Sequence, residues 1–113
     1  MISLPKLLQY AEWFISGTQN PRPYVKIIRN GKTDSKPGAV SIIDGDGGLG
    51  LHIGPMAMKL AIQKAKQFGI GCVLVKNAGH LGGAGYHASM AAKQGCIGQV
   101  LVYLHPMTNS AFE

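Results

Sequence analysis

Residues 72–88, CVLVKNAGHLGGAGYHA, place a histidine between a strand pattern and a helix pattern. The apolar run 72–75 is typical of a buried strand, and an alanine-rich helical pattern starts after the glycines at 82, 83 and 85. Where a glycine loop enters a helix, bare backbone N–H groups and the positive helix end favour an anion. His80 can transfer a proton near neutral pH. The stretch therefore predicts a phosphate site beside a proton-transfer step.

Strand and helix patterns alternate along the chain, which predicts an α/β fold. Helices are predicted at residues 4–15, after the loop at 44–50 as far as 68, and at 85–93; strands are predicted at 24–28, 39–43, 72–75 and 97–103. Pro55 fits the first turn of the middle helix and Gly69 its C-cap. At 113 residues the chain holds one domain at most.

The charge pattern favours a small anionic ligand over a nucleic acid. The net charge is +6, but Lys and Arg are scattered singly, which is typical of a solvated basic surface. No Asp or Glu lies between Asp46 and Glu113, so the field of the second half favours anions. Cys72 and Cys96 lie in apolar runs, which predicts reduced, buried thiols in a cytoplasmic protein. No apolar run approaches the ~20 residues of a membrane span, and no signal peptide is visible.

Residues 45–50, GDGGLG, match the dinucleotide-binding pattern G-x-G-x-x-G between a strand and a helix. We nevertheless predict a structural turn. Asp44 and Asp46 would set two carboxylates against a pyrophosphate, and the next strand ends at Lys76 and Asn77 without the acid that binds the ribose. A Rossmann fold is therefore not expected.

Two stretches, GAVSIIDGDGGLG and AMKLAIQKAKQFGIGCVLVKNAGHLGGAGYHASMAAKQGCIG, resemble the malate/L-lactate dehydrogenase family of non-Rossmann, NAD(P)-dependent oxidoreductases. The family's string Asn-x-x-His-[Phe/Leu]-Gly-x-x-Gly is found here from Asn77 to Gly85. The resemblance runs from about Leu4 to Ser110. It implies an incomplete fold, because the family's Ser-His-Gly-x-x-Arg string and its later nucleotide loops have no counterpart in the chain. Residues 1–20 would be a remnant of a helical domain, 21–38 a linker, and 39–113 a partial NAD(P)-binding oxidoreductase domain.

The resemblance also implies site residues. The cofactor, NAD or NADP, would contact His80, Leu81, Gly82, Gly83 and Ala84. His80 would transfer the proton, although some family members use the His of the Ser-His-Gly string, and a histidine here can also cap the following helix. Tyr86 would contact substrate, with a core aromatic as the favoured alternative, and Asn77 fits a turn as well as a ligand contact. No metal is predicted, since the histidines show no ligand spacing.

Together these observations predict a truncated oxidoreductase that moves a hydride between NAD(P) and a small 2-hydroxy or 2-oxo acid. The resemblance implies a homodimer. The alternative is a catalytically inactive remnant, or a self-associating module that binds a dinucleotide or another anion. A nucleic-acid binder would rest on charge alone, and membrane binding has no support.

Overall fold

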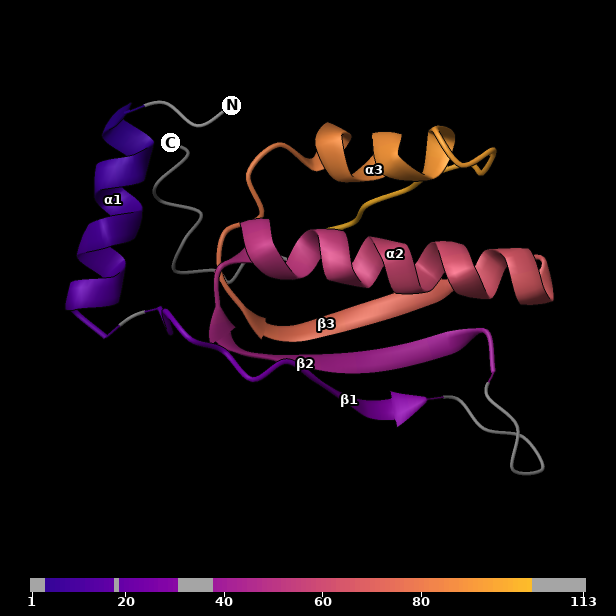
Figure 1. Ribbon diagram of the computed structural model, residues 1–113, viewed down its shortest axis with the longest axis horizontal. Coiled ribbons are helices and arrows are strands. Elements are labelled where there is room, and N and C mark those ends of the chain that lie inside the picture. The colour runs from indigo at the N-terminus through magenta and orange to yellow at the C-terminus, as the bar shows by residue number, and fades with distance from the viewer. Residues whose placement is uncertain (1–3, 18, 31–37, 103–113) are drawn as a thin grey trace.

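The computed structural model describes residues 4–17, 19–30 and 38–102, which form three helices and three strands (Figure 1). The elements are α1 (Leu4–Ile15), β1 (Lys26–Asn30), β2 (Val40–Gly48), α2 (Gly50–Phe68), β3 (Cys72–Ala78) and α3 (Ala84–Ala92). The strands form one sheet in the order β1-β2-β3, with β1 antiparallel and β3 parallel to β2. The predicted α/β class is confirmed.

Helices α2 and α3 lie on one side of the sheet in two tiers (Figure 1). Helix α2 connects the parallel strands β2 and β3 and packs against both, while α3 packs on α2 (Figure 1). The core between α2 and the sheet consists of Ile43, Ile53 and Ala57, with Val25, Leu60 and Val73 around it. This places the ends of β2 and β3 and the beginnings of α2 and α3 at the same end of the molecule.

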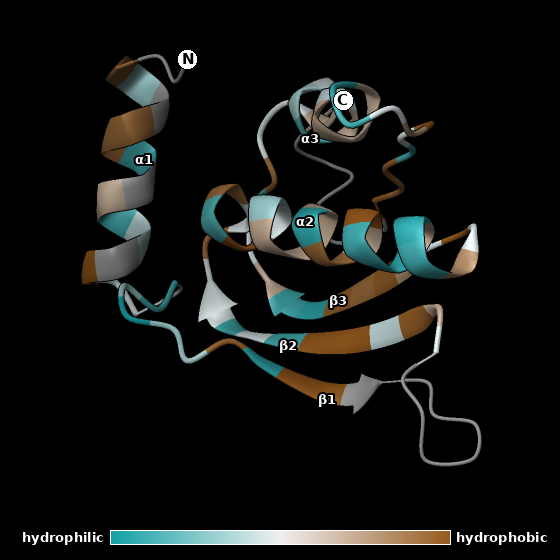
Figure 2. Ribbon diagram, turned by 45° about the vertical axis from the view of Figure 1, so that its right-hand side comes forward, coloured by the Kyte–Doolittle hydropathy of each residue, from teal (hydrophilic) through white to brown (hydrophobic). Residues whose placement is uncertain are grey.

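None of the described helices and strands covers the opposite face of the sheet (Figure 1). Because side chains alternate along a strand, the pairs Val40–Cys72 and Ile42–Leu74 face away from the core pair Ser41–Val73. Val40 is 45% exposed and Leu74 is 53% exposed. The apolar residues of this sheet appear as brown bands along the strands in Figure 2. The predicted burial of the cysteines is therefore wrong: Cys72 is exposed and Cys96 is only half-buried, although both are free as predicted.

Helix α2 begins earlier than its sequence pattern predicted. It starts at Gly50, so Pro55 lies inside the helix and not in its first turn. Because proline has no N–H, it donates no bond to the carbonyl four residues back. The predicted end is confirmed: Gly69 has a φ of 87°, and its N–H donates to the carbonyl of Ala65 at 2.8 Å.

The predicted strand boundaries also differ from the structure. Strand β1 lies two residues later than the predicted 24–28, and β3 continues past residue 75 to Ala78. Strand β2 continues through the glycines to Gly48, where it pairs with Ala78, so most of the predicted loop at 44–50 is strand. The strand predicted at 97–103 is absent over residues 97–102, and residue 103 lies outside the described part. After α3 the N–H of Cys96 bonds to the carbonyl of Ala91, and Gly98 packs against the backbone of Ala88. This contact turns the chain towards α3 instead of towards the edge of β3.

Helix α1 confirms the predicted helix at 4–15 but packs on none of the other described helices and strands. Its apolar residues Leu4, Leu7 and Leu8 are all more than half exposed. Within the described ranges, no helix combines the length and the apolar character that crossing a bilayer requires.

Candidate functional site

Asn77 lies where β3 ends, and it has a structural partner. Its backbone adopts the left-handed conformation with a φ of 56°, and its Nδ2 donates to Asp44 Oδ1 at 3.4 Å. The same Asp44 oxygen accepts the N–H of Asp46 at 2.9 Å. This backbone bond, the Asn77 amide and the nearby Lys76 and Lys26 lower the pKa of Asp44 against the effect of desolvation. The bond to Asp44 thus supports a structural turn role for Asn77.

His80 follows in an exposed loop that leads into α3. Its Nδ1 accepts a hydrogen bond from the N–H of Gly82 at 3.1 Å. Gly82 has a φ of 77°, a conformation that glycine adopts without the steric cost of a side chain. Gly83 is the N-cap of α3, with no side-chain capping bond. His80 therefore stands beside the positive end of a helix.

The beginning of α3 is open to an incoming group. A Cβ built on Gly83 or Gly85 would have no heavy atom within 4 Å. The beginning of α2 is not open, because a Cβ on Gly50 would lie 2.5 Å from the carbonyl oxygen of Gly79 and 2.6 Å from that of His80. Of these two glycine-rich segments, the one that leads into α3 has room for a phosphate.

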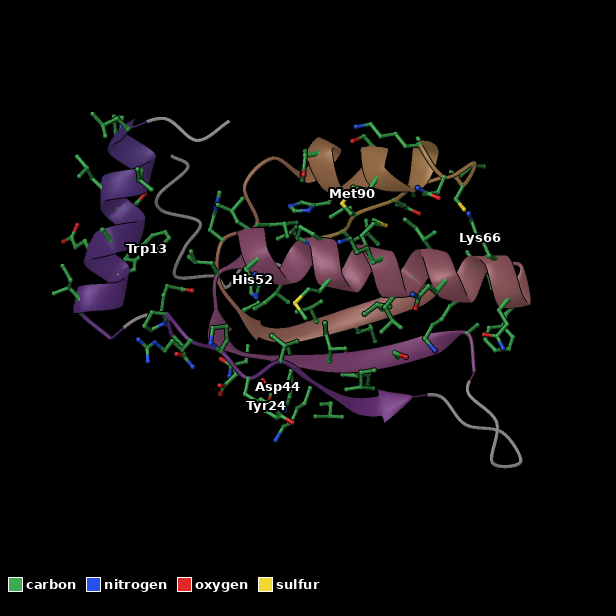
Figure 3. All side chains as sticks on the ribbon, in the orientation of Figure 1. Trp13, Tyr24, Asp44, His52, Lys66 and Met90 are labelled. Carbon is green, nitrogen blue, oxygen red and sulfur yellow. The ribbon has the colours of Figure 1, made fainter. Side chains whose placement is uncertain are left out.

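Other residues of the chain occupy the space around the GDGGLG segment. Asp46 Oδ2 accepts hydrogen bonds from Asn20 Nδ2 at 3.1 Å and from the N–H of Tyr24 at 3.0 Å. Figure 3 shows Asp44 and Tyr24 at the same end of the sheet. A Cβ on Gly48 would lie 2.6 Å from Pro23 Cγ. These contacts support the predicted structural role of the segment, although residues 45–48 form the end of β2 and not a tight turn.

The buried ring at the beginning of α3 belongs to His87 and not to Tyr86. Tyr86 is 64% exposed, so the favoured interpretation of Tyr86 as a core aromatic is wrong for this chain. His87 instead is 2% exposed, and its Nε2 lies 2.8 Å from the carbonyl oxygen of Leu81. The two rings meet edge to face, with centroids 5.4 Å apart. The helical spacing of His87 and Ala91, the buried residues of α3, was the signal that could have revealed it.

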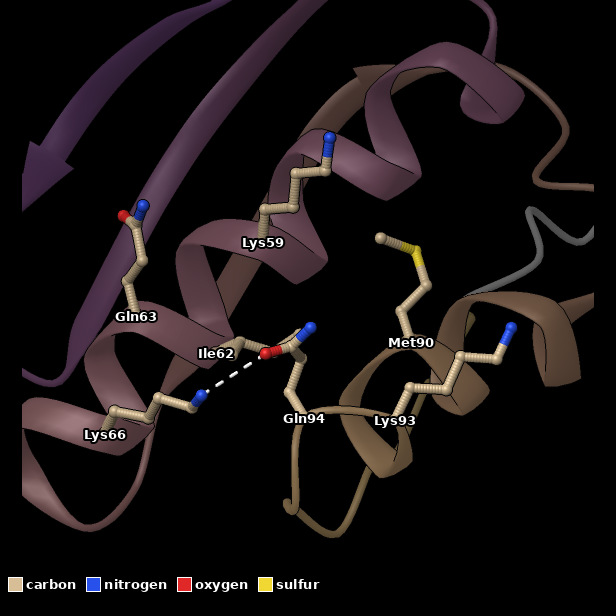
Figure 4. Close-up of a pocket in the computed structure, with 7 residues that line it drawn as sticks. All are labelled: Lys59, Ile62, Gln63, Lys66, Met90, Lys93 and Gln94. Atoms are coloured by element: carbon tan, nitrogen blue, oxygen red, sulfur yellow. Dashed lines mark hydrogen bonds between the residues drawn. The ribbon is translucent and has the colours of Figure 1, made fainter.

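A groove of about 420 Å³ lies between α2 and α3, with Lys59, Lys66 and Lys93 around Ile62 and Met90 (Figure 4). Lys66 Nζ donates to Gln94 Oε1 at 3.3 Å. At 1.5 Å per residue, Lys59 is about 13 Å further along α2 than Gly50. The groove is thus separate from the His80 loop.

The described part of the chain has no group of three His, Cys, Asp or Glu side chains that could hold a metal ion. His52 is exposed on α2, and His105 lies outside the described residues. The candidate site consists of the loop that follows β3, the first turn of α3 and the histidines at 80 and 87.

Comparison with known proteins identifies the class to which this mixed sheet and its glycine-rich loop belong. Residues 4–111 match the malate/L-lactate dehydrogenase family, and the chain belongs to that family. Among its relatives, malate dehydrogenase of Pyrococcus horikoshii is 43% identical over 102 residues, which are 90% of this chain and 27% of the relative. L-Sulfolactate dehydrogenase of Methanocaldococcus jannaschii is 41% identical over 98 residues, which are 87% of this chain and 27% of the relative.

Solved structures agree with this assignment. Malate dehydrogenase from Pyrococcus horikoshii superposes with a TM-score of 0.72 over 82% of this chain and 25% of that chain, at 43% identity. Sulfolactate dehydrogenase from Methanocaldococcus jannaschii gives 0.73 over 81% of this chain and 25% of that chain, at 40% identity. The chain thus spans about a quarter of the length of these relatives. The resemblance predicted from the two motifs is confirmed.

Proposed function

We propose that this chain supplies the dinucleotide-binding loop and a proton-transfer histidine of an NAD(P)-dependent oxidoreductase. The observation that carries the proposal is the open, uncapped beginning of α3 directly after the His80 loop. Family membership supports the same assignment. The proposed location is the cytoplasm, because free cysteines are typical of its reducing conditions.

The residues fit a phosphate-bearing cofactor. The cofactor would contact His80, Leu81, Gly82, Gly83 and Ala84. Glycine at 83 lets the backbone approach a phosphate closely, and the helix end favours its negative charge. When bound, the dinucleotide supplies hydride transfer. The chain's own share is to bind the cofactor, to orient it and to move one proton.

His80 is the proposed proton donor and acceptor. Because its Nδ1 accepts the Gly82 N–H, the neutral ring carries its proton on Nε2. In that resting state Nε2 would donate a hydrogen bond to the substrate oxygen. Proton transfer would run through the imidazolium, in which Nδ1 is protonated and the Gly82 bond is released: the Nε2 proton goes to the substrate oxygen as a 2-oxo acid is reduced and leaves a neutral ring protonated on Nδ1, and oxidation of the 2-hydroxy acid reverses the step. Tyr86, exposed one residue before His87, is the proposed substrate contact.

The proposed substrate is a small 2-hydroxy or 2-oxo acid. Relatives named malate dehydrogenase and L-sulfolactate dehydrogenase act on acids of this kind. The absence of Asp and Glu between residues 46 and 113 favours an anionic substrate as well.

The second candidate is a binding module that self-associates and does not turn over substrate. The chain spans about a quarter of its relatives' length, and one sheet face exposes Val40 and Leu74. Exposed apolar surface of this kind favours association, and the resemblance implies a homodimer. Cofactor binding at the His80 loop is common to both candidates, so it is tested first.

The test compares Gly83→Asp with Gly83→Asn. NADH or NADPH is titrated into each variant, and calorimetry measures the binding affinity. Gly83 has a φ of −75° and no atom within 4 Å of a new Cβ, so both side chains fit. Both also cap the helix well, and only Asp adds a charge. We expect Asp to weaken binding by about tenfold relative to Asn. Equal affinity of the two variants, or no binding by the wild-type chain at millimolar cofactor, would contradict the proposal.

A further inference from the structure

We propose that His87 is a positioning residue for His80 and acts through the single peptide group that joins Leu81 to Gly82. The consequence for catalysis rests on the function proposed above. The hydrogen-bond arrangement itself can be tested without turnover, because it makes statements about two histidine tautomers and one amide.

The two histidines bond to opposite sides of one peptide group. His87 Nε2 lies 2.8 Å from the Leu81 carbonyl oxygen, and since a carbonyl only accepts, Nε2 donates. The N–H of the same peptide group belongs to Gly82 and donates to His80 Nδ1 at 3.1 Å. The peptide bond is trans, so its C=O and N–H point in opposite directions within one rigid plane. A rotation of that plane would break both bonds together.

His87 is held firmly enough to fix this plane. The side chain is 2% exposed and lies over Gly54 of α2. A Cβ on Gly54 would lie 2.8 Å from His87 Cε1 and 2.8 Å from Leu81 Cδ1. The ring and the Leu81 side chain therefore occupy space that exists because residue 54 has no side chain.

The burial of His87 also selects one tautomer. Its Nδ1 is buried and has no hydrogen-bond partner among the described residues. A proton on this nitrogen would be a buried donor without an acceptor, which is costly. The proton therefore stays on Nε2, where the Leu81 carbonyl accepts it. The ring thus donates to the loop through Nε2.

The loop needs such an anchor because its own backbone is permissive. Gly82 and Gly83 follow the peptide group, and glycine rotates at small cost. If the peptide group turned over, His80 Nδ1 would lose the Gly82 N–H. His80 would then populate both tautomers and more than one ring orientation. Chained hydrogen bonds also polarise one another, so the His87 bond strengthens the Gly82 bond.

The experiment measures tautomers by two-bond ¹H–¹⁵N correlation spectra of the full 113-residue chain. In the wild type, His80 and His87 should both be protonated on Nε2. His87→Leu should mix the His80 tautomers and speed hydrogen exchange of the Gly82 amide by about tenfold. His87→Gln carries an N–H near the position of Nε2 and should restore both properties. Met90→Leu, a volume-conserving change on α3, should leave both unchanged.

The wild-type spectrum alone can overturn the proposal, which keeps it testable if His87→Leu fails to fold. A proton on Nδ1 of His87 would do so. Unchanged His80 tautomers and Gly82 exchange in a folded His87→Leu chain would do so as well. Titration with NADH then separates the two proposals. Mixed tautomers with unchanged NADH affinity would support the positioning contact and contradict the loop as the cofactor site.

Discussion

Asp46 accepts a hydrogen bond from the backbone N–H of Tyr24 at 3.0 Å, and this bond ties the segment that enters β1 to the end of β2. Asn20 Nδ2 bonds to the same carboxylate oxygen. Asp46 has a φ of 52°, a conformation that Asp and Asn tolerate better than most residues. The carboxylate of Asp46 is thus used in hydrogen bonds within the chain.

Replacement of Asp46 by Asn should therefore leave the affinity for NADH unchanged. If a pyrophosphate lay against this turn, removal of the charge would reduce repulsion and tighten binding. Asp46→Ala should lower the free energy of unfolding by about 1–3 kcal/mol, because it removes hydrogen bonds and sets an alanine at positive φ. Calorimetric titration and urea denaturation measure the two effects. A clear gain of NADH affinity in Asp46→Asn would revive the Rossmann interpretation.

Asp44 should make the stability of the chain depend on pH. The Asp46 N–H, the Asn77 amide and nearby lysines lower its pKa below the ordinary value of 3.8. A lowered pKa in the folded state adds stability above 3.8 that is lost as pH falls through the folded value. The difference in unfolding free energy between the wild type and Asp44→Asn should therefore be largest near neutral pH and shrink in acid.

Urea denaturation at a series of pH values measures this difference. Glu12→Gln, which removes one carboxylate from α1, controls for the change in net charge. A wild-type to Asp44→Asn difference that stays constant from neutral pH into acid would show that the Asp44 bonds contribute no pH-dependent stability.

Gly54 and Gly85 offer a matched pair of helical glycines. Gly54→Ala would push a Cβ to within 2.8 Å of His87 Cε1, so we expect it to destabilise the fold by about 1–3 kcal/mol. Gly85→Ala meets no atom within 4 Å and should stabilise α3 by about 0.5–1 kcal/mol. Thermal unfolding of both variants checks the contrast. Equal shifts of melting temperature would disprove the close packing of His87 on Gly54.

The sequence predicted what depends on local pattern. Strand β3 and the C-cap at Gly69 follow from apolar spacing and glycine chemistry, and the entry into α3 follows from the glycines after His80. Predictions from the sequence were wrong where a contact between residues far apart in the chain determines the local structure. Gly48 is in a strand because it pairs with Ala78. His87 is buried because Gly54, on another helix, leaves room for its ring.

The last prediction concerns turnover by the 113-residue chain alone, which should be negligible. Catalysis needs the substrate, the cofactor and the proton carrier held together, and misplacement by about 1 Å can cost about a hundredfold in rate. This chain corresponds to 27% of the Pyrococcus horikoshii relative, and its described site offers one exposed histidine beside an open helix end. The family's Ser-His-Gly-x-x-Arg string, from which a second histidine and an arginine would come, is not in its sequence.

The assay follows oxidation of NADH and NADPH with a panel of 2-oxo acids and a cyclic imine, with His80→Ala as the control. Binding without turnover is the expected result, and the His80→Ala rate should equal that of the wild type. Robust cofactor oxidation that disappears in His80→Ala would show that these residues suffice for catalysis. The interpretation of the isolated chain as a binding module would then have to be abandoned.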